Sequence, residues 1–167
     1  MIKKIFITIL LSITLISNSY SAGSSSSGGE GDGPKTKTNY EKAVKLIKSA
    51  NKYEKKGKKD KAQSSYEKAL KLLLKSNNKK PNKPDTLNYL GFTSRKLGDF
   101  ENGEKYYLQG LAINPYHIGI NEYLGELYVA TNRHNLAVER LEVLKGCGCK
   151  EYDDLKAIIA GEKISKY

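Results

Sequence analysis

The chain has 167 residues, of which 38% are hydrophobic, and a formal net charge of +11 at neutral pH. This length suits one folded domain, and without Trp its core must be built from aliphatic side chains and the 12 Tyr. The sequence has no Gly-x-Ser-x-Gly elbow, no phosphate-binding glycine loop ending in Lys-Ser/Thr and no His-Glu-x-x-His motif, so we do not expect an enzyme.

Residues 1–22 have the pattern of a secretory signal peptide. Lys3 and Lys4 precede an apolar run over 5–17, and small residues follow it. The run is too short to cross a bilayer, and no Cys follows the predicted cleavage position near Ser21 or Ala22, which argues against a lipid anchor. We therefore expect export to the periplasm or the cell exterior, with an uncleaved membrane anchor as the alternative. Export makes nucleic acid an unsuitable partner.

Residues 23–38 are rich in Gly and Ser, interrupted by Glu30, Asp32 and Pro34. Such a segment has too few apolar side chains to offset the entropy lost on ordering. It is predicted to be a flexible linker before a folded domain at 39–167.

The folded part repeats itself at a spacing of 34 residues. Small and large residues recur at fixed places, which predicts paired antiparallel helices. The units are placed at 43–76, 84–117 and 118–151. The insertion Asn77–Lys83, in which Pro81 and the following Pro84 flank Asn82 and Lys83, is predicted not to continue a helix. The residues that carry the repeat are Ala50, Tyr53, Gly57, Ala62, Tyr66 and Ala69; Leu87, Leu90, Gly91, Gly98, Asp99, Phe100, Gly103, Tyr107 and Pro115; and Leu124, Gly125, Tyr128, Asn132, Ala137 and Leu141.

Small residues at Ala50, Gly91 and Gly125 let the two helices of a unit approach within the usual 8 to 10 Å. Large residues on the second helices, namely Tyr66, Tyr107 and Leu141, are predicted to fill the space that remains. The predicted helices span 39–56, 59–76, 85–97, 100–113, 118–131, 134–145 and 151–164.

The last predicted helix, 151–164, places Tyr152, Leu155, Ile158 and Ile159 on one stripe, with acidic residues in its first turn. A stack of repeats needs an end that shields the last pair. This helix is therefore predicted to cap the stack.

The period and these residues resemble the tetratricopeptide repeat family, and the middle unit is the strongest match. The resemblance implies an all-α fold, an α-solenoid of three helix pairs plus the capping helix. It also implies a concave groove that holds a peptide of a partner protein. The groove places carried over from the family are Asn51, Glu54, Lys55, Asn88, Tyr89, Phe92, Arg95, Lys96, Glu122, Tyr123 and Glu126.

Phe92 is the most informative of these places, because an aromatic beside Tyr89 and Arg95 could anchor an apolar side chain while Asn51 and Asn88 bind the peptide backbone. In the alternative interpretation, the capping helix or the N-terminal segment folds over the groove and uses these residues internally. The cationic clamp that some family members use for a C-terminal carboxylate is not reproduced, since Ile47 and Gly119 stand where cations would be required.

Charge is concentrated in the first half of the domain. Residues 35–83 hold 17 Lys and 4 acidic residues, whereas residues 84–167 hold 10 Lys or Arg and 12 acidic residues. One interpretation is a docking surface for an acidic protein, an anionic polymer or lipid head groups. The other is that these lysines only solvate the outer faces of helices.

Cys147 and Cys149 are the two cysteines, and an exported chain meets an oxidising compartment. A disulfide across one residue is predicted, with Gly146 and Gly148 allowing the backbone angles, and it would staple the turn before the capping helix. A redox-active pair, a two-coordinate soft-metal site and free or intermolecular thiols are the alternatives. Two Cys are half of a tetrahedral set and the only His are His117 and His134, so we assign no metal and no cofactor.

The sequence therefore predicts a non-catalytic exported adaptor that binds a protein or peptide. The alternatives are a metal or redox accessory protein using Cys147 and Cys149, and a binder of anionic surfaces through the Lys-rich first repeat. No oligomeric state is assigned.

Overall fold

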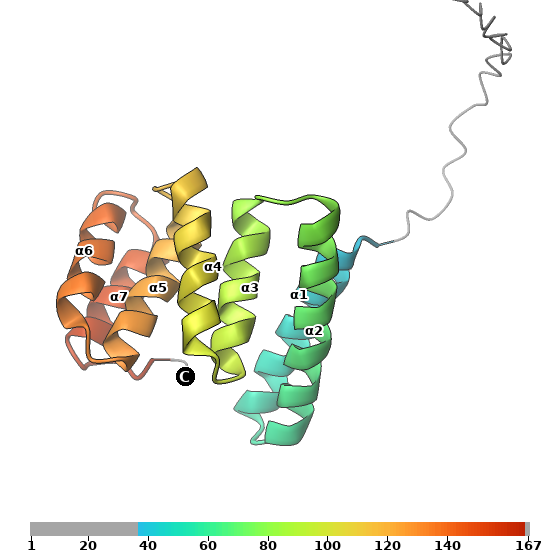
Figure 1. Cartoon of the computed structure of the whole chain (residues 1–167). Coiled ribbons are helices and arrows are strands. Elements are labelled where there is room, and N and C mark those ends of the chain that lie inside the picture. The colour runs from blue at the N-terminus through green and yellow to red at the C-terminus, as the bar shows by residue number, and fades with distance from the viewer. Residues whose placement is uncertain (1–36, 166–167) are drawn as a thin grey trace, which may run out of the picture. The chain divides into compact units, whose positions relative to one another are not determined.

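The computed structural model describes residues 37–165. The predicted signal peptide, 1–22, and nearly all of the predicted linker, 23–38, lie outside the described residues. Within them the chain forms helices joined by short turns and contains no strand, which confirms the all-α prediction (Figure 1). The helices are α1 Asn39–Lys55, α2 Lys59–Lys79, α3 Pro84–Lys96, α4 Phe100–Ile113, α5 Ile118–Ala130, α6 His134–Leu144 and α7 Lys150–Ile159.

The helices are arranged as three successive hairpins, α1/α2, α3/α4 and α5/α6, with α7 packed on α5 and α6 (Figure 1). The first helix of each hairpin also contacts the first helix of the next one. A buried core runs through this stack, first through α1, α2 and α3 and then through α4, α5 and α6. The predicted α-solenoid with a capping helix is therefore the observed architecture. None of the helices among residues 37–165 has both the length and the apolar character needed to cross a membrane.

The turn inside each hairpin contains one residue with a left-handed backbone at the same place in the repeat. These residues are Gly57, Gly98 and Asn132, with φ of 67°, 86° and 59°. Glycine adopts this conformation without steric cost, and Asn tolerates it better than most other residues. A left-handed residue at the same place of each repeat unit thus allows the chain to reverse direction between the paired helices.

Two helix ends differ from the sequence prediction by more than one residue. α2 continues to Lys79 rather than ending at 76, so the first residues of the insertion are helical. The restriction that proline imposes acts on the residue before it, Lys80, and leaves Asn77–Lys79 free to extend the helix. α7 ends at Ile159 rather than 164, because Gly161 has a φ of 74° and the amides of Gly161 and Glu162 bond back to the carbonyls of Ile158 and Ala157.

Gly91 brings α3 and α4 together as predicted, since the ring of Tyr107 fills the space beside it. Gly125 behaves differently. The nearest atoms to a Cβ built on Gly125 belong to Leu155 on α7, and not to Leu141, which is only partly buried. The capping helix therefore takes the place that a large residue on α6 was predicted to fill.

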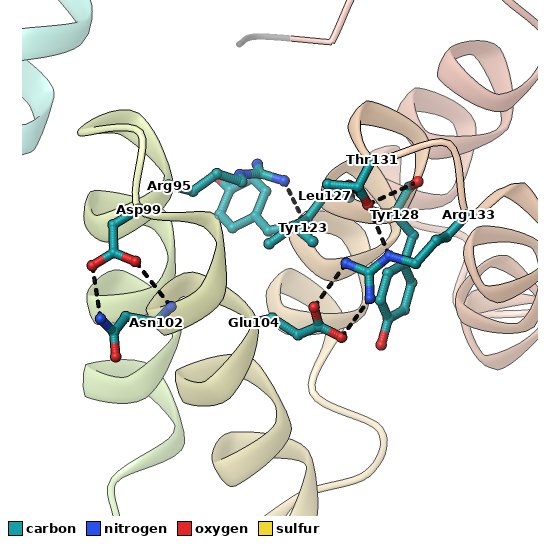
Figure 2. A network of polar contacts seen from close by, with 9 residues as sticks. All are labelled: Arg95, Asp99, Asn102, Glu104, Tyr123, Leu127, Tyr128, Thr131 and Arg133. Atoms are coloured by element: carbon teal, nitrogen blue, oxygen red, sulfur yellow. Dashed lines mark hydrogen bonds and ion pairs between the residues drawn. The ribbon is translucent and has the colours of Figure 1, made fainter.

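An arginine fork braces α4 against the turn between α5 and α6 (Figure 2). Arg133 donates to both carboxylate oxygens of Glu104 at 2.9 and 2.7 Å, and its guanidinium lies 4.6 Å from the ring centroid of Tyr128. Its Nε donates to Thr131 at 2.9 Å. A bidentate pair of this kind fixes geometry as well as adding energy. It holds the second and third hairpins in register.

The segment after α7 is held by Asp154, whose carboxylate accepts hydrogen bonds from Lys150 and Lys163. These two contacts hold the pKa of Asp154 down at about 2. The folded-state pKa lies below the unfolded one, so the pair stabilises the fold above about pH 4 and this contribution is lost as the pH falls toward 2.

We expect Asp154→Asn to lower the free energy of unfolding by about 1 kcal/mol at neutral pH, a modest value because Lys150 is exposed and solvent screens its charge. Urea unfolding at several pH values measures this. The difference from the unsubstituted protein should shrink between pH 4 and pH 2. The control is Asp153→Asn, an exposed neighbour on the same helix, and an equal loss in both variants would contradict the assignment.

Candidate functional site

The predicted groove residues lie on α1, α3 and α5, the first helices of the three hairpins, and we call the surface that these helices share the inner face. Some of these residues connect α1 to its neighbours. The Tyr66 hydroxyl on α2 lies 2.5 Å from Asn51 Oδ1 and 3.0 Å from Glu54 Oε2, and Lys96 Nζ lies 2.7 Å from Glu54 Oε2. Asn51, Glu54 and Lys96 therefore connect α1 to α2 and α3.

Phe92 is a packing residue and not an exposed anchor. It is 5% exposed, and its ring lies between those of Tyr66 and Tyr123, with centroid distances of 6.2 and 5.2 Å. Phe92 lies on α3, one of the predicted groove helices, but the neighbouring tyrosines cover its ring. A partner peptide does not reach Phe92 in this conformation.

Arg95 and Glu126 form an ion pair inside the protein (Figure 2 shows Arg95 beside Tyr123). Arg95 Nη2 lies 3.1 Å from Glu126 Oε2, both side chains are 0% exposed, and Arg95 also donates to the Tyr123 carbonyl. The Arg95 guanidinium lies 5.9 and 5.8 Å from the ring centroids of Tyr107 and Tyr123. These residues join α3 to α5 inside the protein, so their partners are the groove helices themselves and not the capping helix or the N-terminal segment of the alternative interpretation.

The segment after α7 also contacts the buried ion pair, because the Ser165 hydroxyl donates to Glu126 Oε2 at 3.3 Å. Glu122 is also buried, at 4% exposed, whereas Lys55 is exposed. Asn88 is 8% exposed, and its Oδ1 has no hydrogen-bond partner among residues 37–165.

Partly buried tyrosines remain available on the inner face: Tyr40 on α1, Tyr89 on α3 and Tyr123 on α5. The rings of Tyr40 and Tyr89 meet edge to face with centroids 5.9 Å apart. Burial, assisted by Tyr89 and Asp85, raises the pKa of Tyr40 to about 12, and burial also raises the pKa of Tyr89 and of Tyr123. All these hydroxyls are therefore protonated hydrogen-bond donors at neutral pH.

Tyr40 is a residue that the sequence analysis did not select. It precedes the first repeat unit, so the repeat register assigns it no place. The signal that could have found it is the capping box at Thr38 and Glu41, which starts α1 at Asn39 and so puts Tyr40 in its first turn.

Cys147 and Cys149 are joined by a disulfide in the turn between α6 and α7. Gly146 and Gly148 on either side have φ of 88° and 60°. Among residues 37–165, no group of three or more His, Cys, Asp or Glu side chains is placed to hold a metal ion. The disulfide lies on the turn that leads into the capping helix.

Residues 46–72 and 85–117 match the sequence profile of the tetratricopeptide repeat. These two segments are tetratricopeptide repeats. The matched segments cover α1 with α2 and α3 with α4, while the third hairpin lies outside the match. The tetratricopeptide assignment explains the 34-residue spacing and the small residues at the helix crossings.

Solved tetratricopeptide domains share this fold. The first such domain of Spaghetti (RPAP3), solved with the HSP90 peptide SRMEEVD, is 21% identical, has a TM-score of 0.53, and the match covers 75% of this chain and 95% of that one. The first domain of human RPAP3 is 21% identical, with a TM-score of 0.54 and coverage of 72% and 91%. The second domain of human RPAP3, solved with the HSP70 peptide SGPTIEEVD, is 18% identical, with a TM-score of 0.51 and coverage of 73% and 98%. The comparison with curated proteins found no match.

Proposed function

We propose that this protein is a non-catalytic, exported adaptor that holds an extended peptide segment of a partner protein on its inner face. The observation that carries the proposal is the presence of partly buried tyrosines with protonated hydroxyls on three successive first helices, Tyr40, Tyr89 and Tyr123. Tyr supplies a large contact area together with a hydrogen-bond donor at a low cost in side-chain entropy.

The face has the features needed to bind an irregular chain. The tyrosine rings offer apolar surface, and their protonated hydroxyls can donate to peptide carbonyls. The solved domains of RPAP3 that resemble this chain were determined with short HSP90 and HSP70 peptides. That observation supports a peptide ligand for this chain as well, without indicating which peptide it binds.

The anchor of such a peptide is Tyr89 rather than Phe92. Tyr89 is central, because its ring contacts Tyr40 on α1 and its burial leaves the ring partly accessible. Phe92 and Arg95 then act as the packed layer beneath, which keeps the tyrosines in fixed positions. Export follows from the sequence pattern of residues 1–22 and remains part of the proposal.

We expect Tyr89→Ala to weaken binding about tenfold, for peptides selected on the purified protein from a displayed library of random sequences. The physical reason is the loss of an aromatic surface and a donor at the centre of the face. Fluorescence anisotropy with the selected peptides measures the change.

The matched control is Tyr106→Ala, which removes a partly buried tyrosine from α4, a second helix that does not form the inner face. Circular dichroism checks that both variants keep their helices. A library that yields no binding peptide, or peptides that bind both variants equally, would contradict the proposal.

A further inference from the structure

A cavity of about 520 Å³ lies where the N-terminal ends of α1 and α3 meet the C-terminal end of α2. Figure 1 shows that the connection from α2 to α3 runs along this end of the hairpins. The volume lies within the range of about 300 to 1,000 Å³ that is typical of ligand sites. The cavity is lined mainly by charged and polar residues, among them Lys37, Tyr40, Lys79, Lys80, Lys83 and Asp85.

The seven extra residues between the first two repeat units build one wall of this cavity. They lengthen α2 to Lys79 and then turn the chain back through Pro81 to Pro84, where α3 begins. Lys79, Lys80 and Lys83 all come from this segment. A segment that appeared in the sequence only as an interruption of the repeat thus brings three ammonium groups to one side of a cavity.

The lysines of the cavity are set apart from the other lysines of the first hairpin by their common position and not by their pairing, because Lys68 and Lys71 also form no ion pair with residues 37–165. None of Lys37, Lys79, Lys80 and Lys83 forms an ion pair with any residue in the range 37–165, and Asp85 instead lies 3.1 Å from His117 Nε2. By contrast, Arg133 and Lys163 contact carboxylates of the protein itself. Unpaired like charges around a cavity repel each other and attract an anion.

The cavity is continuous with the inner face through Tyr40. Tyr40 lines the cavity and its ring also contacts Tyr89, so an extended chain lying across Tyr89 reaches the lysines within a few residues. α3 starts at this point, and its N-cap residue Lys83 makes no side-chain capping bond. The positive end of the helix dipole adds a smaller attraction for the same kind of ligand.

We propose that this cavity binds the carboxylates of an acidic segment in the partner protein. The inference rests on the proposed function, because it takes the ligand to be a peptide that also lies on the inner face. It accounts for the gathering of Lys79, Lys80 and Lys83, which form no ion pair with residues 37–165, at one end of that face. It also gives the bound chain a direction, with its acidic part over the α2–α3 connection.

The test uses the full-length protein and a fluorescein-labelled peptide of alternating Glu and Gly, with the same peptide carrying Gln for Glu as the neutral probe. The variant Lys79→Gln/Lys83→Gln removes two charges from the cavity. The matched variant Lys68→Gln/Lys71→Gln removes two exposed charges of α2 that lie outside the cavity. Inorganic pyrophosphate and phosphatidylglycerol vesicles are titrated in parallel.

We expect the acidic peptide to bind more tightly than the neutral one at low salt. The cavity variant should weaken this binding about tenfold, and the matched variant about twofold or less, because exposed charges away from the site are screened. Equal losses in the two variants would show that binding follows net charge, which overturns the proposal. Binding of pyrophosphate or vesicles through the same lysines without binding of the acidic peptide also overturns it, as does the absence of binding to every probe.

Failure of this inference is distinguishable from failure of the proposed function. Peptides selected from the library on the inner face are measured against both lysine variants. If they depend on Tyr89 but bind the cavity variant as well as the original protein, the inner-face function stands and the cavity has no part in it. If the selected peptides bind the cavity variant more weakly and carry acidic residues at one end, both the inner-face function and the cavity proposal are supported.

Discussion

Glu126→Ala is expected to lower the free energy of unfolding by about 3 to 5 kcal/mol, because the charge of Arg95 would remain buried without the carboxylate that neutralises it. Both side chains of this pair are completely excluded from solvent, and Arg95 is also enclosed by the rings of Tyr107 and Tyr123. Urea unfolding followed by circular dichroism gives the change directly.

The control for this pair is Glu139→Ala, which removes a carboxylate that lies 3.7 Å from Arg140 and is 59% exposed. It is expected to change stability by about 0.5 kcal/mol or less, as surface pairs do. The double variant Arg95→Met/Glu126→Leu should recover most of the loss, since replacing both members of a buried pair by apolar groups is often neutral. A Glu126→Ala protein as stable as Glu139→Ala would show that the pair is open to solvent.

Gly91→Ala is expected to destabilise the protein by about 2 kcal/mol or more, although Ala favours a helix over Gly by about 1 kcal/mol. The added Cβ would lie 2.5 and 2.6 Å from Cε1 and Cδ1 of the Tyr107 ring. That ring is fully buried, so it cannot swing aside, and α3 and α4 must separate. Thermal and urea unfolding measure the loss.

Gly103→Ala is the matched substitution in the same hairpin, because its Cβ would meet the Gly91 carbonyl oxygen at 3.3 Å, a smaller conflict. We expect Gly103→Ala to lower the free energy of unfolding clearly less than Gly91→Ala does. In a double-mutant cycle, Tyr107→Leu should reduce the cost of Gly91→Ala by about 1 kcal/mol or more. The Tyr107 hydroxyl has no hydrogen-bond partner among residues 37–165, so removing it leaves none of the described groups without a partner. A stabilising effect of Gly91→Ala would contradict the predicted helix contact.

These expectations decide which substitutions can report on binding. Phe92, Arg95 and Glu126 belong to the packed layer between the hairpins, and changing them alters stability before it alters any ligand contact. Tyr89 and the cavity lysines are partly or fully accessible, and they contact less of the core. Binding experiments on this protein should therefore use the tyrosines and lysines, with the buried residues kept for measurements of stability.

The secondary structure could be predicted closely from the sequence because it depends on local chemistry. The repeated spacing of small and large residues, the left-handed positions at Gly57, Gly98 and Asn132, and the proline after α2 all act within a few residues of chain. The larger errors concern the ends of two helices. A capping motif at Gly161 ends α7 earlier than predicted, and α2 extends into the insertion as far as Lys79.

The candidate site could be predicted only in part. The repeat register placed Tyr89 and Tyr123 on the inner face, but it could not distinguish them from Phe92, Arg95 and Glu126, which are buried at neighbouring places of the same face. That difference depends on which side chain a neighbouring helix covers, and Tyr66, Tyr107 and Tyr123 come from separate parts of the chain.

The sequence by itself determined the helical repeat, its period and the concentration of positive charge before residue 84, because these are properties of neighbouring residues and of composition. Only the tertiary structure decided which predicted groove residues are buried, that Leu155 rather than Leu141 packs on Gly125, and that lysines of an insertion surround a cavity with Tyr40. The physical reason is that burial and charge pairing depend on distances between residues far apart in the chain, and those distances exist only after the hairpins have packed.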